Sequence, residues 1–154
     1  MRLAIDTNVL VYAEGLGHDP RTPQALHLLS VCTDNPAMDV VLPVQVLGEL
    51  FNVLTRKLRL PVPEARERLQ GWADSFSVAD AGWATFQSAI DLCDAHGLQF
   101  WDALILCTAA DQRCRVLLSE DFHTGFTWHG VTVVNPFTTP VHPLLQDILT
   151  PPGA

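Results

Sequence analysis

The sequence predicts an α/β fold, a three-layer α/β/α sandwich around a central, mainly parallel sheet. Short apolar runs typical of buried strands alternate along the chain with longer segments of helical periodicity. Two of these runs, Leu3–Ile5 and Arg115–Ser119, lead directly into acidic residues. The segment Trp101–Ala110 is apolar nearly all round, which is typical of a helix buried against a sheet. A parallel sheet covered by helices accounts for all three observations.

The expected elements follow one another closely from the N-terminus. Leu3–Ile5 reads as a strand that turns at Asp6 into a helix, and Pro63 suits the first turn of another helix. We expect strands at 3–5, 39–42, 76–78, 115–118 and 131–134. We expect helices at 7–14, 23–33, 44–58, 63–74, 82–96 and 100–113. Residues 1–137 therefore form a single expected domain, and the Pro-rich tail, residues 138–154, is expected to have little regular structure.

Four acidic residues lie far apart in the sequence but at positions that this fold brings together. Asp6 and Asp121 each follow a strand, and ligands of open α/β sheets collect at the carboxyl ends of strands. Asp102 stands at the start of the buried helix. Glu49 belongs to a polar stripe on the helix 44–58, which faces either water or a polar cleft. The sequence thus predicts a cluster of four carboxylates.

Taken singly, each acid has an ordinary structural explanation. Asp6 and Asp102 suit helix caps, Asp121 suits a solvated turn, and Glu49 suits an exposed helix face. Taken together, neighbouring carboxylates repel one another unless a cation holds them. Hard oxygen ligands favour Mg²⁺ or Mn²⁺. The set therefore predicts a metal centre.

The charge balance argues against a simple nucleic-acid binder. The chain carries 9 Lys and Arg against 17 Asp and Glu, a net charge of −8, whereas proteins that hold phosphate backbones usually carry basic patches. The basic residues gather in one part of the sequence, at positions 56, 57, 59, 66 and 68. They could flank an acidic cleft and grip RNA phosphates, or serve only as surface charge near a helix C-terminus. Both interpretations stay open.

Composition indicates a compact cytoplasmic protein. Hydrophobic residues make up 48% and the mean hydropathy is +0.19. No apolar run approaches the roughly 18 residues of a membrane span, and the N-terminus lacks the apolar region of a signal peptide. The four cysteines form no CxxC pair and no zinc-type spacing, so we expect reduced thiols.

Several motifs in this order resemble a PIN-domain ribonuclease, and more narrowly the toxin subunit of a VapBC toxin–antitoxin pair. The motifs are Ile5–Leu10, Leu47–Leu50, Phe100–Ile105, Leu117–Phe122 and Val133–Phe137. The resemblance extends over residues 1 to 137. It implies that Asp6, Asp102 and Asp121 hold the metal directly or through water, and that Glu49 completes the acidic pocket. Ser119 matches a position that is usually a hydroxyl residue in the family.

The resemblance also implies an activity and partners. The expected activity is metal-dependent hydrolysis of RNA by water, with Mg²⁺ or Mn²⁺, leaving 5′-phosphate and 3′-hydroxyl ends. The expected substrate is tRNA or rRNA. The expected protein partners are a cognate antitoxin and a second copy of the chain in a homodimer, and no membrane partner is expected.

Other classes of protein remain open from the sequence. A housekeeping RNA-processing nuclease would have the same fold. A haloacid-dehalogenase-type phosphatase would use Asp6 as a nucleophile, but Asn8 stands where its second acid belongs, and the only lysine, Lys57, lies mid-chain on a helix. A third alternative is a protein that only binds RNA or an antitoxin.

Overall fold

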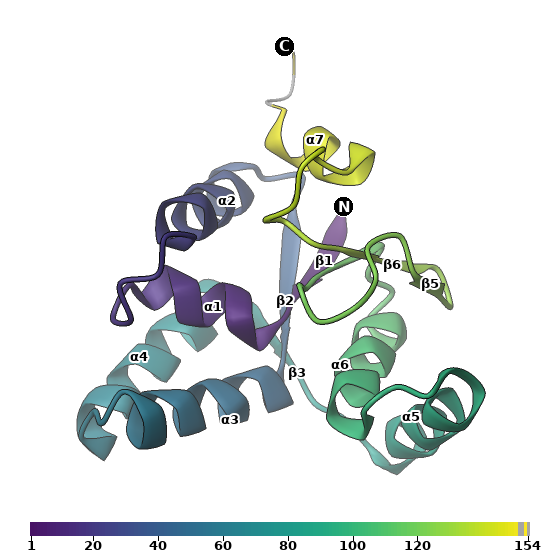
Figure 1. Cartoon of the computed structure of the whole chain (residues 1–154), viewed down its shortest axis with the longest axis horizontal. Helices are drawn as coiled ribbons and strands as arrows, with labels where there is room; N and C mark the ends of the chain where they lie inside the picture. The colour runs from purple at the N-terminus through teal and green to yellow at the C-terminus, as the bar shows by residue number, and fades with distance from the viewer. Residues whose placement is uncertain (151–152, 154) are drawn as a thin grey trace.

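A six-stranded sheet with helices on both sides forms the body of the molecule. The computed structural model describes residues 1–150 and 153. The strand order is β3-β2-β1-β4-β6-β5, and every neighbouring pair is parallel except β5 with β6. Figure 1 shows α1 to α4 on one side of β1 and β2, with α5 and α6 on the other. The predicted three-layer α/β/α sandwich is confirmed.

The strands are short, and the central ones are almost fully buried. Their bounds are β1 Arg2–Ile5, β2 Asp39–Pro43, β3 Ser77–Ala79, β4 Val116–Leu118, β5 Thr127–Trp128 and β6 Val131–Val134. Leu3, Leu117 and Val133 have no exposed surface. Strands covered on both faces read as continuous apolar runs rather than as alternating ones, which is why they were recognisable in the sequence.

The helices follow the predicted order closely. Their bounds are α1 Thr7–Glu14, α2 Thr22–Asp34, α3 Val44–Asn52, α4 Val62–Ser75, α5 Trp83–His96, α6 Phe100–Asp111 and α7 Pro143–Leu149. Helix α6 is buried along Ala103–Ala109, as its uniformly apolar sequence predicts. In the part of the chain that the structure describes, no helix is long and apolar enough to cross a membrane.

The structure differs from the sequence prediction at three elements. The expectation of little regular structure after Phe137 is wrong for α7, where Leu145 and Ile148 are buried in the common core and stabilise the helix against α2. The expected helix 44–58 changes at Val53–Lys57 into a π-helical turn. The two-residue strand β5 was not predicted, because so short a strand carries no periodic signal. Residues 151, 152 and 154 of the predicted tail lie outside the described residues.

Strand register brings β1 and β4 to the same edge of the sheet. Ile5 pairs with Leu118, and the Asp6 amide donates to the Leu118 carbonyl at 2.9 Å. The Ser119 amide donates in turn to the Val134 carbonyl at 3.0 Å. The chain therefore leaves β1 and β4 side by side, at residues 6 and 119.

Candidate functional site

Ser119 links the two acids that follow β1 and β4. Its hydroxyl donates to Asp6 Oδ2 at 2.6 Å and accepts from the Asp121 amide at 3.1 Å. Asp6 Oδ1 accepts from the Thr7 amide at 2.7 Å, at the first turn of α1. Asp6 and Ser119 are buried, with 1% and 0% of their surface exposed. A buried carboxylate with two donors is held in one orientation, so Asp6 combines helix capping with a fixed place in the cluster.

Two of the other carboxylates, those of Asp121 and Glu49, are positioned by polar side chains of α1. Asn8 Nδ2 donates to both oxygens of Asp121, at 3.2 and 3.1 Å. The Thr7 hydroxyl donates to Glu49 Oε2 at 2.5 Å. Asp102 lies in the first turn of α6, where its amide donates to the Gln99 side chain. The cluster is therefore assembled from β1, β4, α3 and α6.

The pKa shifts show that the four carboxylates interact. Burial raises the pKa of Asp6 to about 7 although Ser119 and Thr7 donate to it, and the charges of Asp121 and Asp102 add to the rise. Burial and the charges of Asp121 and Glu49 raise the pKa of Asp102 to about 6. The pKa of Asp121 is also raised, by burial first and then by Glu120 and Glu49. Each of these three aspartates therefore has its charged form disfavoured first by burial and then by at least one neighbouring carboxylate.

The donor set has the chemistry of a site for a hard divalent cation. It offers only carboxylate oxygens, and a cation would offset both the burial of the charges of Asp6, Asp102 and Asp121 and the repulsion among them. Within residues 1–150 and 153, no three His, Cys, Asp or Glu side chains are gathered closely enough to hold an ion as they stand. Hydrogen bonds from Ser119, Asn8 and Thr7 hold the carboxyl groups in their present positions.

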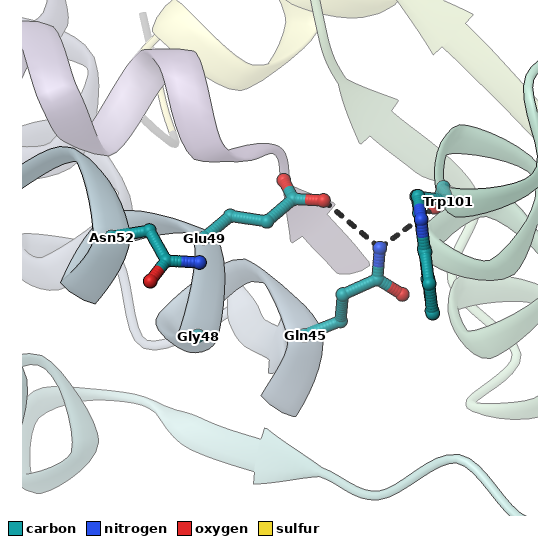
Figure 2. A pocket seen from close by; sticks show the side chains of 5 residues that line it. All are labelled: Gln45, Gly48, Glu49, Asn52 and Trp101. Carbon is teal, nitrogen blue, oxygen red and sulfur yellow. Dashed lines mark hydrogen bonds between the residues drawn. The ribbon is translucent and has the colours of Figure 1, made fainter. Parts of the chain in front are cut away.

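Beside the acidic cluster, a pocket of about 470 Å³ opens between α3 and α6. Its lining residues are Gln45, Gly48, Glu49, Asn52 and Trp101. Figure 2 shows the Gln45 amide nitrogen lying between the Glu49 carboxylate and the Trp101 backbone. The first part of the polar stripe of α3, at Gln45, Glu49 and Asn52, thus lines an open cleft, while Arg56 at its end is exposed to water, so each of the two alternatives holds for part of the stripe.

A second polar cluster, which the sequence analysis missed, holds the chain next to Asp121. Glu120 accepts from the Tyr12 hydroxyl and, at 2.9 Å, from Arg21. Arg21 also pairs with Asp19 at 2.9 Å, and its guanidinium lies 4.1 Å from the centre of the Tyr12 ring. The sequence contained one signal for this cluster: Tyr12, the only tyrosine of the chain, lies on the helix that follows Asp6. The loop before α2 therefore braces the loop after β4.

One of the basic residues considered for RNA binding has another role. Arg68 Nη1 pairs with Glu14 at 2.7 Å, and the Glu14 side chain is only 5% exposed. Trp72 Nε1 donates to the same carboxylate at 2.6 Å. Arg68 is thus committed to joining α4 to α1, while Arg56, Lys57 and Arg59 are exposed.

The chain belongs to the PIN domain family. The family model matches residues 3–124, which include all four acids. No curated protein matches the chain in sequence.

Solved structures with the same fold include toxins and toxin–antitoxin complexes. VapC20 from Mycobacterium tuberculosis, described as a sarcin-ricin loop cleaving toxin, has a TM-score of 0.66 at 18% identity and covers 82% of this chain and 97% of its own. VapBC2 from Rickettsia felis, bound to a promoter DNA fragment, has a TM-score of 0.62 at 17% identity, covering 86% and 97%. A toxin–antitoxin complex from Klebsiella pneumoniae has a TM-score of 0.62 at 20% identity, covering 88% and 98%. These likenesses establish the shared fold.

Proposed function

We propose that this protein is a metal-dependent endoribonuclease and the toxin of a VapBC-type pair. The observation that carries the proposal is the gathering of four carboxylates: Asp6, Asp102 and Asp121 have raised pKa values, and the charge of Glu49 adds to the rise at Asp102 and Asp121, which supports a cation site. Membership of the PIN family supports a nuclease. The similar structures, a toxin and two toxin–antitoxin assemblies, support the toxin role.

The four acids divide the work in the proposed reaction. Asp6, Asp102 and Asp121 would hold Mg²⁺ or Mn²⁺, and Glu49, fixed by Thr7 and Gln45, would orient the ion or its water. The bound ion supplies activation of water and charge stabilisation at the scissile phosphate. Ser119 keeps Asp6 turned into the cluster. In the proposed step, water attacks the phosphorus and the bond from phosphorus to the 3′-oxygen breaks, so that one product would carry a 5′-phosphate and the other, after its 3′-oxygen takes up a proton, a 3′-hydroxyl.

The proposal is tested by incubating end-labelled tRNA and rRNA with the protein in Mg²⁺, Mn²⁺ or EDTA. The wild type is compared with Asp6→Asn and Asp102→Asn, and Asp94→Asn on the exposed face of α5 is the matched control. We expect cleavage that requires metal, persists in the control and is lost in both site variants. Cleavage that persists in EDTA or in the site variants would contradict the assignment.

The proposed protein partners follow from the toxin role. We propose that the chain binds a cognate antitoxin and forms a homodimer. Co-expression with the product of a small adjacent gene, followed by size-exclusion chromatography with light scattering, tests both associations. A monomer that leaves the small protein unbound would argue for the housekeeping alternative.

A further inference from the structure

The pocket beside Glu49 contains an amide oxygen that lacks a donor. Gln45 Nε2 donates to Glu49 Oε1 at 2.9 Å and to the Trp101 carbonyl at 3.0 Å. Both partners are acceptors, so turning the amide over would place oxygen against oxygen and lose two hydrogen bonds. Gln45 Oε1 is therefore fixed in place. It is buried and accepts no hydrogen bond from any residue that the structure describes.

A buried acceptor without a partner is unfavourable, so the site gains when a donor reaches it. Leaving such a group unpaired costs about 1–3 kcal/mol. In Figure 2 the Gln45 amide oxygen points toward the Trp101 side chain. Since this oxygen is buried, a ligand N–H reaches it only when the Trp101 indole moves aside, and a flat ligand that packs along the indole would bring an N–H at its edge to that place.

The walls of the pocket favour a flat, uncharged ligand. Trp101 stands at one side with 49% of its surface exposed, an unusual exposure for a large aromatic side chain. Gly48 leaves space, since no heavy atom of the described residues, apart from its chain neighbours and the nearby backbone of its own helix, lies within 4 Å of where its Cβ would be. Asn52 adds a carboxamide that can donate and accept. The Glu49 carboxylate also lines the pocket and repels anions, so a phosphate group does not belong there.

We infer that this pocket is a subsite for one unpaired nucleobase of the substrate RNA, stacked on Trp101 and presenting an N–H to Gln45. The inference rests on the proposed ribonuclease function and deepens it. In a duplex, both faces of a base are stacked and its Watson–Crick edge is already paired, so only an unpaired base can enter. Glu49 of the acidic cluster lines the same pocket as Trp101, which places the stacked base next to that cluster. Trp101 and Gln45 thus bind a base of the RNA close to the bond that is cleaved.

The test measures RNA binding separately from cleavage. Binding is measured by fluorescence anisotropy in Mg²⁺ with a labelled 12-nucleotide single strand of mixed sequence and with the corresponding duplex. All proteins carry Asp6→Asn, which keeps the RNA intact and does not touch the pocket. Trp101→Leu is compared with Trp83→Leu, a matched loss of a tryptophan that is 70% exposed on α5. Trp101→Phe keeps an aromatic surface and serves as the rescue variant.

We expect Trp101→Leu to weaken single-strand binding about 5- to 150-fold, the equivalent of ~1–3 kcal/mol per stacked base. Trp83→Leu should change binding less than about twofold, and Trp101→Phe should retain most of the affinity. The duplex should bind more weakly than the single strand and respond little to Trp101→Leu. Equal losses in the two leucine variants, no loss in Trp101→Leu, or no measurable single-strand binding before these substitutions would overturn the subsite.

Cleavage by proteins with Asp6 intact separates this inference from the proposed function. If Trp101 governs binding but the wild type cuts no RNA, the nuclease proposal fails and the subsite stands. If the wild type cuts RNA and Trp101→Leu leaves both binding and kcat/KM unchanged, the subsite fails and the nuclease stands. Thermal unfolding of each variant confirms that the exposed substitutions leave the fold intact.

Discussion

Replacing Ser119 with alanine tests how the acidic cluster is held together. The hydroxyl of Ser119 is fully buried, donates to Asp6 Oδ2 at 2.6 Å and accepts from the Asp121 amide at 3.1 Å. In Ser119→Ala, the buried Asp6 carboxylate loses one hydrogen-bond donor and the Asp121 amide loses this acceptor. A hydrogen bond to a charged group contributes about 1.5–3 kcal/mol and a neutral one about 0.5–1.5 kcal/mol. We therefore expect the free energy of unfolding to fall by about 2–4 kcal/mol when Asp6 is ionised.

The expected loss depends on pH because Asp6 is protonated more readily than an ordinary aspartate. Its pKa is raised from 3.8 to about 7 in the folded protein, so the native state binds this proton more tightly than the unfolded chain does. The ionisation of Asp6 by itself therefore lowers the free energy of unfolding as the pH rises from about 4 to about 7. Ser119 counters this effect by donating to the charged form. At pH 5, where Asp6 is neutral, the loss in Ser119→Ala should shrink to about 1–2 kcal/mol.

Urea unfolding in EDTA at pH 5 and pH 8 measures both values. Ser30→Ala is the matched control, because the Ser30 hydroxyl also donates to a carboxylate, that of Asp34, but on an exposed surface at 3.1 Å. An exposed pair of this kind contributes little, so the control should change stability by less than about 0.5 kcal/mol at either pH. An equal loss at both pH values for Ser119→Ala, or a loss no larger than in the control, would refute the reasoning.

Three further predictions concern the cluster and its supports. Asp102→Asn should raise the melting temperature at pH 8 but not at pH 4.5, as measured by thermal unfolding in EDTA. The reason is that burial and the charges of Asp121 and Glu49 raise the pKa of Asp102 to about 6, so the substitution removes an unfavourable charge only at the higher pH. Calorimetry with added Mg²⁺ should show stabilisation of the wild type by mass action and a smaller shift in Asp102→Asn, and equal shifts would contradict the metal assignment. Leu145→Ala should lower the free energy of unfolding by about 2–5 kcal/mol, because Leu145 is buried in the core with 2% of its surface exposed. An unchanged midpoint of urea unfolding would show that α7 does not stabilise the domain.

The order of the strands and helices was predictable because buried elements carry strong local signals. The apolar run before Asp6 and the uniformly apolar segment of α6 appear in the structure where the sequence placed them. Helix α7 was not predicted because the four prolines of the tail indicate irregular structure more strongly than its short apolar pattern indicates a helix. The helix is stabilised by packing against α2 rather than by local propensity. The strand β5 pairs with β6 through two residues only, so its existence depends on that partner.

For the candidate site, the sequence determined which carboxylates end a strand or begin a buried helix, since both are local properties. It also placed Gln45, Glu49 and Asn52 on one stripe of a helix. Only the tertiary structure decided that this stripe faces a pocket closed by Trp101, and that Ser119 joins Asp6 to Asp121. The physical reason is that the deciding contacts join residues far apart in the chain: Ser119 and Asp6 are 113 positions apart, and Gln45 and Trp101 are 56. Their distances depend on strand register and helix packing, which only the folded chain fixes.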